Sequence, residues 1–555
     1  MMASITQVLE RSLANYIYLS GIPATPRDYV RRALNLLIAS AAATGVITYF
    51  ALVVAQVPAM VIVGVMPFAY SLYLLFRPVV KAKSFESQCM RELPYVAAFM
   101  TSYAAVGIPP HRSMNAVGLK ERIFPAFARL VRRMEAVRMI TVKDPLETIE
   151  EEADKISTLP LKDFLQSAVG AERGGGGMYN VLKDKMRSLF NELKERYKAL
   201  GDQLKLFGDL LLVFFGVLPL LLYTMLTVFA SDMAITTSRL FTFMITPLLV
   251  VTLAIMIDTG YPSTPQSFNK YYMRALTLGA PIGAAVAAVF YFSPVLVETL
   301  LGARFVQYKL AVSIGTGLVA FTAVATWVFF RDYKFMNDVE YALPSFVRDL
   351  TEEVKKGKSP TQATIYLSEV RSYNKAFNSV LQHVAAQLRV GRSLKEALEP
   401  FRGRVSWRSE LILDLVADAE ELGAQKEIFE EVTEISREIR DAIRVAKAKT
   451  TGIKYFGFMV ALLMIFIASL LIKQIIVPLA NLAVNVPQGI GLGNIKLLRP
   501  DQLPELIDTI STGIVLNATF LGVLTGKMSD GITAAGFLYS FVYTLAALVA
   551  MAFLF

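Results

Sequence analysis

Nine largely apolar stretches in this 555-residue sequence are long enough to cross a lipid bilayer. A membrane-spanning helix needs about 20 consecutive apolar residues, and helices of a water-soluble core seldom run apolar for so long. The mean hydropathy is +0.48, and 54% of all residues are hydrophobic. The stretches are residues 34–54, 57–76, 206–230, 240–257, 275–300, 308–330, 456–478, 507–526 and 532–555. The sequence therefore predicts an all-α polytopic membrane protein with about nine transmembrane helices.

Two long polar stretches divide these spans into three groups. Apolar residues recur at near-heptad spacing just before the spans at 206 and 456, which predicts amphipathic helices that continue into the membrane. We therefore expect two homologous cytoplasmic helical-bundle domains. The expected parts are an N-terminal cytoplasmic segment (1–33), transmembrane helices 1–2 (34–76), cytoplasmic domain 1 (77–205), transmembrane helices 3–6 (206–330), cytoplasmic domain 2 (331–454) and transmembrane helices 7–9 (455–555).

The two polar stretches carry the same short signature about 250 residues apart. Each has Leu-Pro, then a glycine after twelve residues, then a proline, and each later has Ala-Glu followed by a glycine. The repeated positions are Pro94, Gly107, Pro110, Glu172 and Gly175 in the first copy, and Pro344, Gly357, Pro360, Glu420 and Gly423 in the second. Self-similarity at a fixed period indicates a duplicated structural module.

The signature is typical of helix ends. Proline is tolerated in a first helical turn, so Pro94 and Pro344 are expected to open helices of about three turns. The following glycines are expected to end those helices in a left-handed conformation, and the second prolines to begin the next helices. The repeated residues are therefore expected to shape a helical bundle.

The distribution of basic residues predicts the orientation. The two polar stretches hold 22 and 21 Lys and Arg residues, and Arg27, Arg31 and Arg32 directly precede the first span. Cytoplasmic loops are enriched in Lys and Arg. We expect a cell-membrane protein whose N-terminus and two large polar stretches are cytoplasmic, and whose first span serves as the insertion signal in place of a cleaved signal peptide.

Several kinds of chemistry lack the residues they need. Cys89 is the only cysteine and the two histidines are His111 and His383, so we expect neither a disulfide nor a metal site. A Walker-type phosphate loop is also not expected, because Gly526-Lys527 is followed by methionine instead of Ser or Thr. The sequence predicts no catalytic residues and no cofactor.

Two basic clusters are candidate docking surfaces for a partner protein. They are Arg129, Arg132, Arg133 and Arg138 in the first stretch, and Arg437, Arg440, Arg444 and Lys447 in the second. Spacings of three and four place each cluster largely on one helical face, and the first stretch has 22 basic against 16 acidic residues. Three interpretations are open: a solvated face paired with nearby carboxylates such as Glu135 and Asp441, attraction to anionic lipid headgroups, or docking of an acidic partner. Nucleic-acid binding is not expected, because acidic residues are nearly as numerous and no aromatic stacking platform accompanies the clusters.

Within the spans, small residues are more informative than charged ones. The pairs Gly279/Gly283 and Gly522/Gly526 have the four-residue spacing of close helix packing. Such packing is expected either within one chain or between the protomers of a dimer. Few ionisable residues lie deep in a span, which argues against an ion pathway.

The chain resembles the F-type membrane platform proteins of type II secretion and type IV pilus machines. The resemblance rests on the segments LPYVAAFMTSYAAVGIPP and LPSFVRDLTEEVKKGKSP, and on the later AERGG and AEELG. With its paired N-terminal spans and C-terminal group of spans, the chain is most similar to the archaeal platforms of archaella and adhesive pili. The resemblance covers about residues 77–260 and 331–555, although the four-glycine run 174–177 has no counterpart in the second copy.

The resemblance implies a non-enzymatic platform that couples a cytoplasmic hexameric ATPase to the extraction of pilin or archaellin subunits into a filament. It also implies a homodimer embedded in the lipid bilayer, with nucleotide hydrolysis by the partner. Archaellum, adhesive pilus and secretion pseudopilus remain open. The alternative is a secondary transporter with duplicated halves. A membrane enzyme is a further alternative, and it would need a catalytic cluster that the sequence does not contain.

Overall fold

The computed structural model is helical throughout the part of the chain it describes. It describes residues 2–49, 60–229, 231–261, 265–302, 305–306, 308–423, 425–478 and 502–554. None of these residues lies in a strand, and several helices are long and apolar enough to cross a membrane. The predicted all-α polytopic fold is confirmed. The chain forms two compact units, Met1–Leu189 and Phe190–Phe555, which are described separately.

Unit 1 begins with three helices that pack together. They are α1 (Met2–Ser20), α2 (Pro26–Tyr49) and α3 (Met60–Ala104), and their shared core contains Leu13, Ile17, Val30, Ala33 and Leu75. Four shorter helices follow, which we call lobe 1 together with the adjoining parts of α3 and α8. They are α4 (Pro110–Gly118), α5 (Pro125–Thr141), α6 (Pro145–Asp154) and α7 (Leu159–Arg173). The long helix α8 (Met178–Leu211) begins in unit 1 and ends in unit 2.

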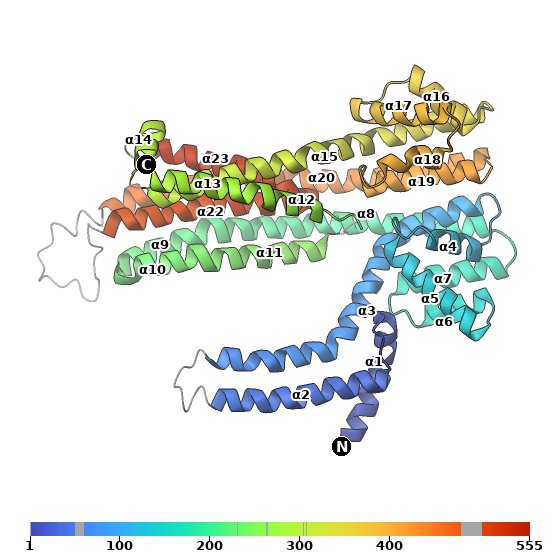
Figure 1. The fold of residues 1–555 in the computed structure, drawn as a ribbon, viewed down its shortest axis with the longest axis horizontal. Helices are drawn as coiled ribbons and strands as arrows, with labels where there is room; N and C mark the ends of the chain where they lie inside the picture. Colours follow the sequence, from blue (N-terminus) through green and yellow to red (C-terminus); the bar gives the residue numbers. More distant parts are fainter. Residues whose placement is uncertain are drawn as a thin grey trace, which may run out of the picture. The chain divides into compact units, whose positions relative to one another are not determined.

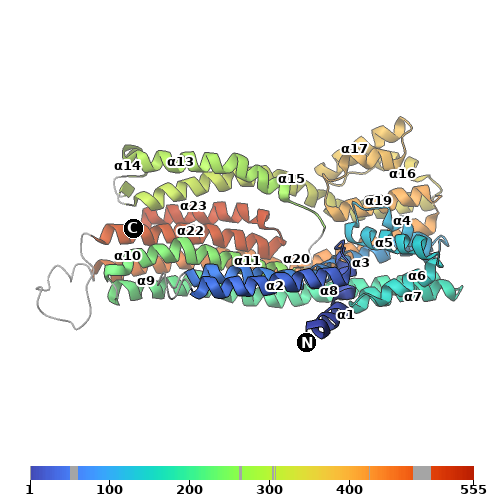
Figure 2. The same cartoon turned by 60° about the horizontal axis from the view of Figure 1, so that its bottom comes forward.

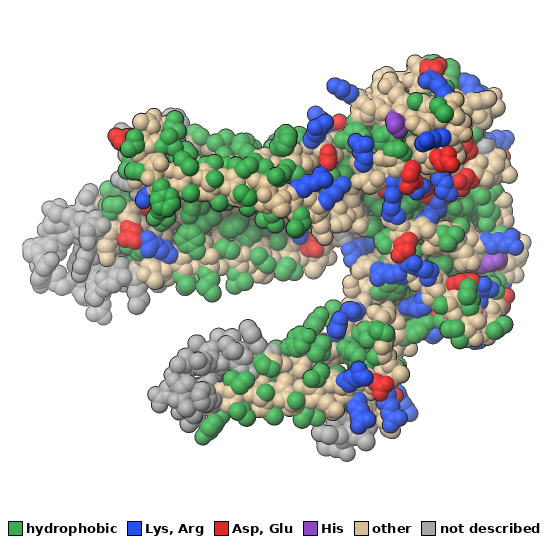
Figure 3. All heavy atoms as spheres, in the orientation of Figure 1, with side chains coloured by type: hydrophobic (Ala, Val, Ile, Leu, Met, Phe, Trp, Pro, Cys, Tyr) green, Lys and Arg blue, Asp and Glu red, His purple; other side chains and the backbone are tan. Residues whose placement is uncertain are grey.

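Unit 2 combines membrane-length helices with a second lobe. Lobe 2 comprises α16 (Pro360–Val370), α17 (Lys375–Arg389), α18 (Leu394–Leu398) and α19 (Trp407–Glu421), with the adjoining parts of α15 (Lys309–Lys355) and α20 (Lys426–Leu470). The remaining helices are α9 (Leu218–Phe229), α10 (Ser231–Leu240), α11 (Thr246–Gly260), α12 (Asn269–Arg274), α13 (Ala280–Phe292), α14 (Pro294–Leu301), α22 (Leu503–Asp530) and α23 (Gly536–Leu554). In Figures 1 and 2, α15, α22 and α23 lie side by side. Figure 3 shows hydrophobic side chains over the membrane-length helices of this unit, with charged side chains gathered on lobe 2.

Eight helices of the described residues have the length and composition of a membrane span. They correspond to eight of the nine expected stretches, and the helix of α22 is the most enclosed, with 83% of its most apolar segment buried. The exception is the expected span 57–76. Residues 50–59 lie outside the described residues, and the remainder forms the first part of α3, which is not among the eight.

The expected span 275–300 is shorter in the structure. Helix α13 ends at Phe292, and Pro294 opens the separate short helix α14. The end predicted at residue 300 is therefore wrong. The residue before a proline is disfavoured in the helical conformation, and Ser293 accordingly has ψ near 75°.

Prolines inside the membrane helices coincide with wide, π-helical turns. Four such turns end at Val217, Ile245, Gly279 and Ile476, each two residues before a proline. Because proline has no N–H to donate, the regular i to i−4 ladder is interrupted there. A π-turn lets the helix continue through the proline, so Pro219, Pro247 and Pro281 do not end their spans.

The prediction that Pro94 and Pro344 open helices is wrong. Pro94 lies inside the 45-residue α3, and Pro344 lies inside the 47-residue α15. An internal proline costs about 3 kcal/mol in an isolated helix. Tertiary packing overrides this cost, because the preceding Leu93 and Leu343 are completely buried in the lobes.

The predicted left-handed conformation of Gly107 and Gly357 is confirmed, with φ of +79° and +92°. Gly175 and Gly423, for which no conformation was predicted, also have positive φ, of +66° and +98°. Pro110 is the first residue of α4 and Pro360 the first residue of α16. Each of the five helices α4 to α8 begins 248 to 250 residues before its counterpart in α16 to α20. The duplication therefore extends over the whole helical order of the two lobes.

The small residues within the spans pack against helices of the same chain. A Cβ atom on Gly283 would lie 2.8 Å from the carbonyl oxygen of Gly317 on α15. Cβ atoms on Gly522 and Gly526 would lie even closer to the backbone of Ser540 and Gly536 on α23. These contacts favour packing within one chain, and the glycine pairs give no support to a dimer interface.

Candidate coupling site

Long helices cross each border between an expected cytoplasmic domain and its neighbouring spans. Helix α8 runs past residue 205, α15 past residue 330 and α20 past residue 454. The predicted continuation of the amphipathic helices at 206 and 456 into apolar helices is confirmed. A continuous helix is a stiff connection about 1.5 Å long per residue, so a displacement of lobe 2 reaches the membrane helices directly.

Helices α8 and α20 pack against each other at equivalent positions of the repeat. A Cβ atom on Gly201 would lie 2.9 Å from the Lys449 side chain, and one on Gly208 would lie 3.1 Å from the Phe456 ring. Both pairs are separated by 248 residues. Lys194 also forms an ion pair with Glu438 at 2.6 Å. The two helices therefore run in parallel and in register.

Helix α15, which also connects lobe 2 to the membrane helices, is held at its N-terminal end by a carboxylate that no sequence pattern indicated. Asp508 of α22 accepts hydrogen bonds from the backbone N–H groups of Leu310 (3.0 Å) and Ala311 (2.9 Å). No side chain of α15 caps this helix start. Asp508 thus supplies the cap, which pairs a carboxylate with the positive end of the helix.

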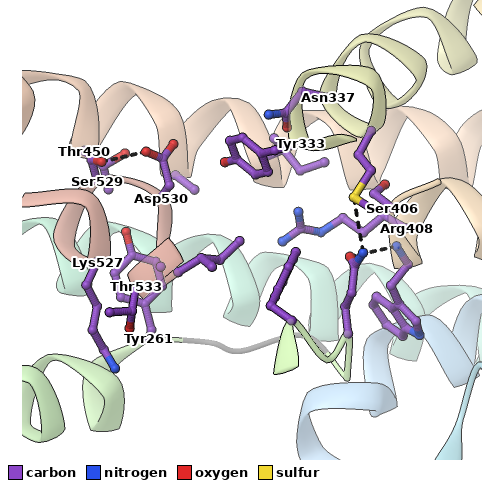
Figure 4. Close-up of a pocket in the computed structure, with 18 of the residues that line it drawn as sticks. Tyr261, Tyr333, Asn337, Ser406, Arg408, Thr450, Lys527, Ser529, Asp530 and Thr533 are labelled. Atoms are coloured by element: carbon purple, nitrogen blue, oxygen red, sulfur yellow. Dashed lines mark hydrogen bonds between the residues drawn. The ribbon is translucent and has the colours of Figure 1, made fainter. Parts of the chain in front are cut away.

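A polar cavity of about 550 Å³ lies where these helices meet lobe 2 (Figure 4). Its walls come from α8, α15, α19, α20, the C-terminal end of α22 and the segment that joins α11 to α12. Figure 4 shows the Arg408 guanidinium reaching into the cavity toward Tyr333, with Ser529 and Asp530 on another wall. The cavity therefore separates lobe 2 from the membrane helices over part of their junction.

Lobe 2 is attached to the other walls through the start of α19. The Trp407 N–H donates to the Gln266 side-chain oxygen (3.1 Å), and the Gln266 amide lies 3.5 Å from the Met336 sulfur. Next to it, Arg408 donates to the Tyr197 hydroxyl of α8 at 3.2 Å and pairs with Glu340 of α15 at 3.4 Å. Residues from three other segments thus meet at two consecutive positions of α19.

Ion pairs join the C-terminal end of α22 to two neighbouring helices near the cavity. Lys527 of α22 lies 3.0 Å from Asp258 of α11, and Lys454 of α20 lies 3.4 Å from Asp530. Burial raises the pKa of the Tyr333 hydroxyl, so this group stays protonated and can donate a hydrogen bond. Hydrogen bonds and ion pairs therefore join lobe 2 and the membrane helices around the cavity.

The repeated glutamates close each lobe internally. The Glu172 carboxylate accepts the His111 N–H (2.9 Å) and also contacts the His111 ring, directly after Pro110. In lobe 2, Glu420 contacts the Thr361 hydroxyl, directly after Pro360, and accepts the N–H of Leu394 at 3.2 Å. Each glutamate therefore joins the last helices of its lobe to the helix start at the repeated proline.

The first basic cluster is already engaged within lobe 1. Arg132 pairs with Glu121 at 2.7 Å, Arg138 contacts Glu135, and Arg133 lies 3.3 Å from the fully buried Glu152. Arg129 donates to Gln88 at 2.8 Å. This cluster agrees with the interpretation of a face paired with local carboxylates.

The second basic cluster is different. Arg437, Arg440, Arg444 and Lys447 are all exposed on α20. Among the described residues, only Arg440 of the four has an ion-pair partner, Asp441 at 3.9 Å. The structure therefore leaves three cations of this cluster available for a partner.

No sequence pattern indicated Gln266, Arg408 or Asp508. Each is a single polar residue, and its bond to Trp407, Tyr197 or Leu310 joins positions 141, 211 or 198 residues apart, respectively. Within the described residues no group of three or more His, Cys, Asp or Glu side chains is placed to hold a metal ion. The buried Cys89 has a raised pKa because of desolvation, which leaves its thiol unreactive.

The comparison with known families bears on lobe 2. Residues 346–472 match the family described as Type II secretion system (T2SS), protein F. This range covers lobe 2, α20 and the start of the π-turn after it. The match supports the F-domain family, to which the sequence resemblance also pointed. No curated protein and no solved structure matches the chain significantly.

Proposed function

We propose that this chain is the membrane platform of a type IV pilus-like filament or secretion machine. In this role it couples a cytoplasmic hexameric ATPase to the extraction of pilin or archaellin subunits and to filament assembly. The main support for this proposal is the protein F match at residues 346–472, which covers a lobe whose helices continue into apolar, membrane-length segments. The platform itself supplies no catalytic group in this proposal, and both lobes face the cytoplasm.

The mechanical part of the proposal rests on the helices that connect lobe 2 to the membrane and on the cavity at their junction. Helices α15 and α20 begin or end in lobe 2, and α15 is capped at its other end by Asp508. The cavity at Arg408 and Asp530 gives lobe 2 room to move relative to the helix ends. A push on lobe 2 would then tilt or shift α15 and α20 in the bilayer, where hydrophobic pilin segments are held before extraction.

The docking part rests on the second basic cluster. At about 1.5 Å per residue, Arg437 lies roughly 28 Å along α20 from the expected span start at residue 456. Surface potentials decay over a Debye length of about 8 Å at physiological salt. With α20 perpendicular to the bilayer, Arg437 and Arg440 are therefore too far from the membrane surface to serve mainly as lipid contacts. This favours an acidic face of the ATPase as their partner.

Charge reversal of this cluster tests the docking. In the full-length protein, Arg437→Glu, Arg440→Glu and Arg444→Glu together are expected to lower ATPase recovery in a pull-down at least about tenfold, because each reversal replaces attraction with repulsion. The matched control reverses three other exposed cations of lobe 2, Lys375, Arg392 and Arg404. Equal ATPase recovery by the cluster variant, the control and the wild type would discard the docking surface.

The cellular role is tested by deleting the gene and scoring two phenotypes separately. Loss of surface filaments or of secreted protein with unchanged nutrient uptake is the expected result. Intact filaments with defective uptake would instead favour a secondary transporter. Restoration of filaments by the wild-type chain, and failure of the cluster variant to restore them, would connect both experiments.

A further inference from the structure

A second cavity, of about 290 Å³, lies beside the 550 Å³ cavity described above and has one polar and one apolar end. Lys447, Thr450, Thr451 and Lys454 of α20 line its polar end. Its apolar end consists of Phe329 and Phe330 of α15 and of Ala534, Ala535 and Leu538 near the start of α23. The six residues Tyr333, Asn337, Lys447, Thr450, Ser529 and Asp530 are shared with the larger cavity.

The cavity crosses the expected membrane surface. On α15 its lining runs from Thr326, inside the expected span 308–330, to Asn337 in the polar region. This corresponds to about 16 Å along the helix. The headgroup layer on one side of a bilayer is about 5 to 8 Å thick. The apolar end therefore lies at the depth of acyl chains, and the polar end lies at the depth of headgroups and beyond.

The charges of the cavity favour a single anion. Its charged lining residues are Lys447, Lys454 and Asp530. Lys454 pairs with Asp530 at 3.4 Å, and Asp530 also accepts the Ser529 hydroxyl at 2.7 Å. Lys447 is exposed and forms no ion pair with a described residue. One positive charge thus remains, which matches the single negative charge of a phosphodiester.

We propose that this cavity binds one anionic phospholipid from the leaflet that faces lobe 2. The phosphate lies near Lys447 and Lys454, and an acyl chain lies over Phe330 and Leu538. Phe330 is 44% exposed at the apolar end, where it can contact lipid. Basic pockets between transmembrane helices at the cytoplasmic surface are suited to such headgroups.

A bound lipid would connect the helices at the junction between lobe 2 and the membrane spans. The bound headgroup would bridge α20 to the middle of α15 and to the C-terminal end of α22. The site needs no ATPase, so its test is independent of the docking proposal. Binding is measured on the purified full chain in neutral detergent, by native mass spectrometry with phosphatidylglycerol and, in parallel, with phosphatidylcholine.

The expected result is one phosphatidylglycerol retained per chain and weaker retention of phosphatidylcholine. Lys447→Gln should weaken phosphatidylglycerol binding about fivefold, the effect expected of one lysine near a lipid surface. Lys447→Arg should restore it. Arg437→Gln makes the same change of charge on the same helix, roughly 15 Å farther from the membrane, and should leave binding unchanged.

Three outcomes would overturn the assignment. Unchanged binding by Lys447→Gln would mean that this cavity holds no headgroup. Equal weakening by Arg437→Gln would indicate nonspecific attraction to the whole basic face of α20. Displacement of the lipid by millimolar inorganic phosphate would indicate a site for free anions.

Discussion

The two lobes have the same order of helices but stabilise their helix starts differently. In lobe 1, two buried carboxylates of α3 reach across to other helices. Glu92 accepts the N–H groups of Ala126 (3.0 Å) and Phe127 (2.8 Å) of α5. Glu86 accepts the N–H of Ser157 (3.0 Å) just before α7.

Lobe 2 uses local caps at the corresponding places. Asn374 accepts the N–H of Phe377 at 2.8 Å, and Ser406 accepts the N–H of Ser409 at 3.2 Å. Ser359 and Ser393 form complete capping boxes with the glutamine or glutamate three residues later. None of these four caps is a carboxylate, and each is close in sequence to the helix that it stabilises.

This difference shows how a duplicated module can diverge while its shape is kept. The starts of α5 and α7 in lobe 1 depend on tertiary contacts to carboxylates that can take up a proton. The starts of α17 and α19 in lobe 2 are capped by Asn374 and Ser406, which are close in sequence to the N–H groups that they accept and do not titrate near neutral pH. The helices of lobe 2 therefore depend less on contacts with distant residues. This property fits the lobe that carries the unpaired cations and borders the larger cavity.

The largest expected difference between the lobes concerns Glu92. Glu92→Ala leaves two buried N–H groups without an acceptor, each worth about 1 to 3 kcal/mol. We expect the α5 amides to lose about 4 kcal/mol of protection in hydrogen exchange of the full chain at pH 6. Asn374→Ala in lobe 2 should lower the protection of α17 by only about 1 kcal/mol, the usual effect of losing an exposed local cap.

Equal losses in the two lobes would remove the distinction between long-range and local caps. Hydrogen exchange is the suitable measurement because it reports each lobe separately in a chain that need not unfold in one step. Glu121→Ala, an exposed residue of lobe 1 paired with Arg132, is the control and should change protection little.

The second expected difference between the lobes is how their stability depends on pH. Desolvation raises the pKa of Glu92 to about 7, although the backbone N–H groups of Phe127 and Ala126 oppose this. Between pH 4.5 and 7 the folded lobe therefore keeps a proton that the unfolded chain has lost. The stability of lobe 1 should fall as pH rises through this window, by on the order of 3 kcal/mol, and level off above pH 7.

The measurement is hydrogen exchange of α5 and α17 at several pH values, corrected for the intrinsic exchange rate. α17 should show no comparable fall. Glu92→Gln should abolish the dependence in α5, because an amide does not titrate. A dependence that survives this substitution would assign the effect to another group.

The smallest expected difference lies at the end of α5. Val142 has φ of +53° and is 88% exposed, whereas the corresponding position of lobe 2 is Gly391, with φ of +89°. A left-handed conformation costs a non-glycine residue about 1 to 2 kcal/mol. Val142→Gly should therefore stabilise the end of α5 by up to about 1 kcal/mol, and Gly391→Val should destabilise the end of α17 by about as much or more. Melting of the full chain and exchange of the flanking amides are the readouts, and a destabilising Val142→Gly would show that this valine makes a contact that offsets its strain.

The sequence by itself determined the class of the protein and its repeated parts. Runs of apolar residues near bilayer length predict spans, because the unsatisfied backbone of any other structure would be too costly in lipid. The glycines at 107 and 357 were predictable as turns, because only glycine adopts positive φ without strain. The prolines at 110 and 360 were predictable as helix starts for an equally local reason.

Only the tertiary structure decided what depends on distant partners. Whether Pro94 opens a helix or lies within one is set by the packing around Leu93, and local preference alone favoured the wrong answer. Arg133 and Arg437 look alike in sequence, but one lies 3.3 Å from the buried Glu152 and the other has no ion pair among the described residues. Backbone preference is local and can be read from neighbouring residues, whereas burial and pairing arise when segments far apart in the chain are brought together.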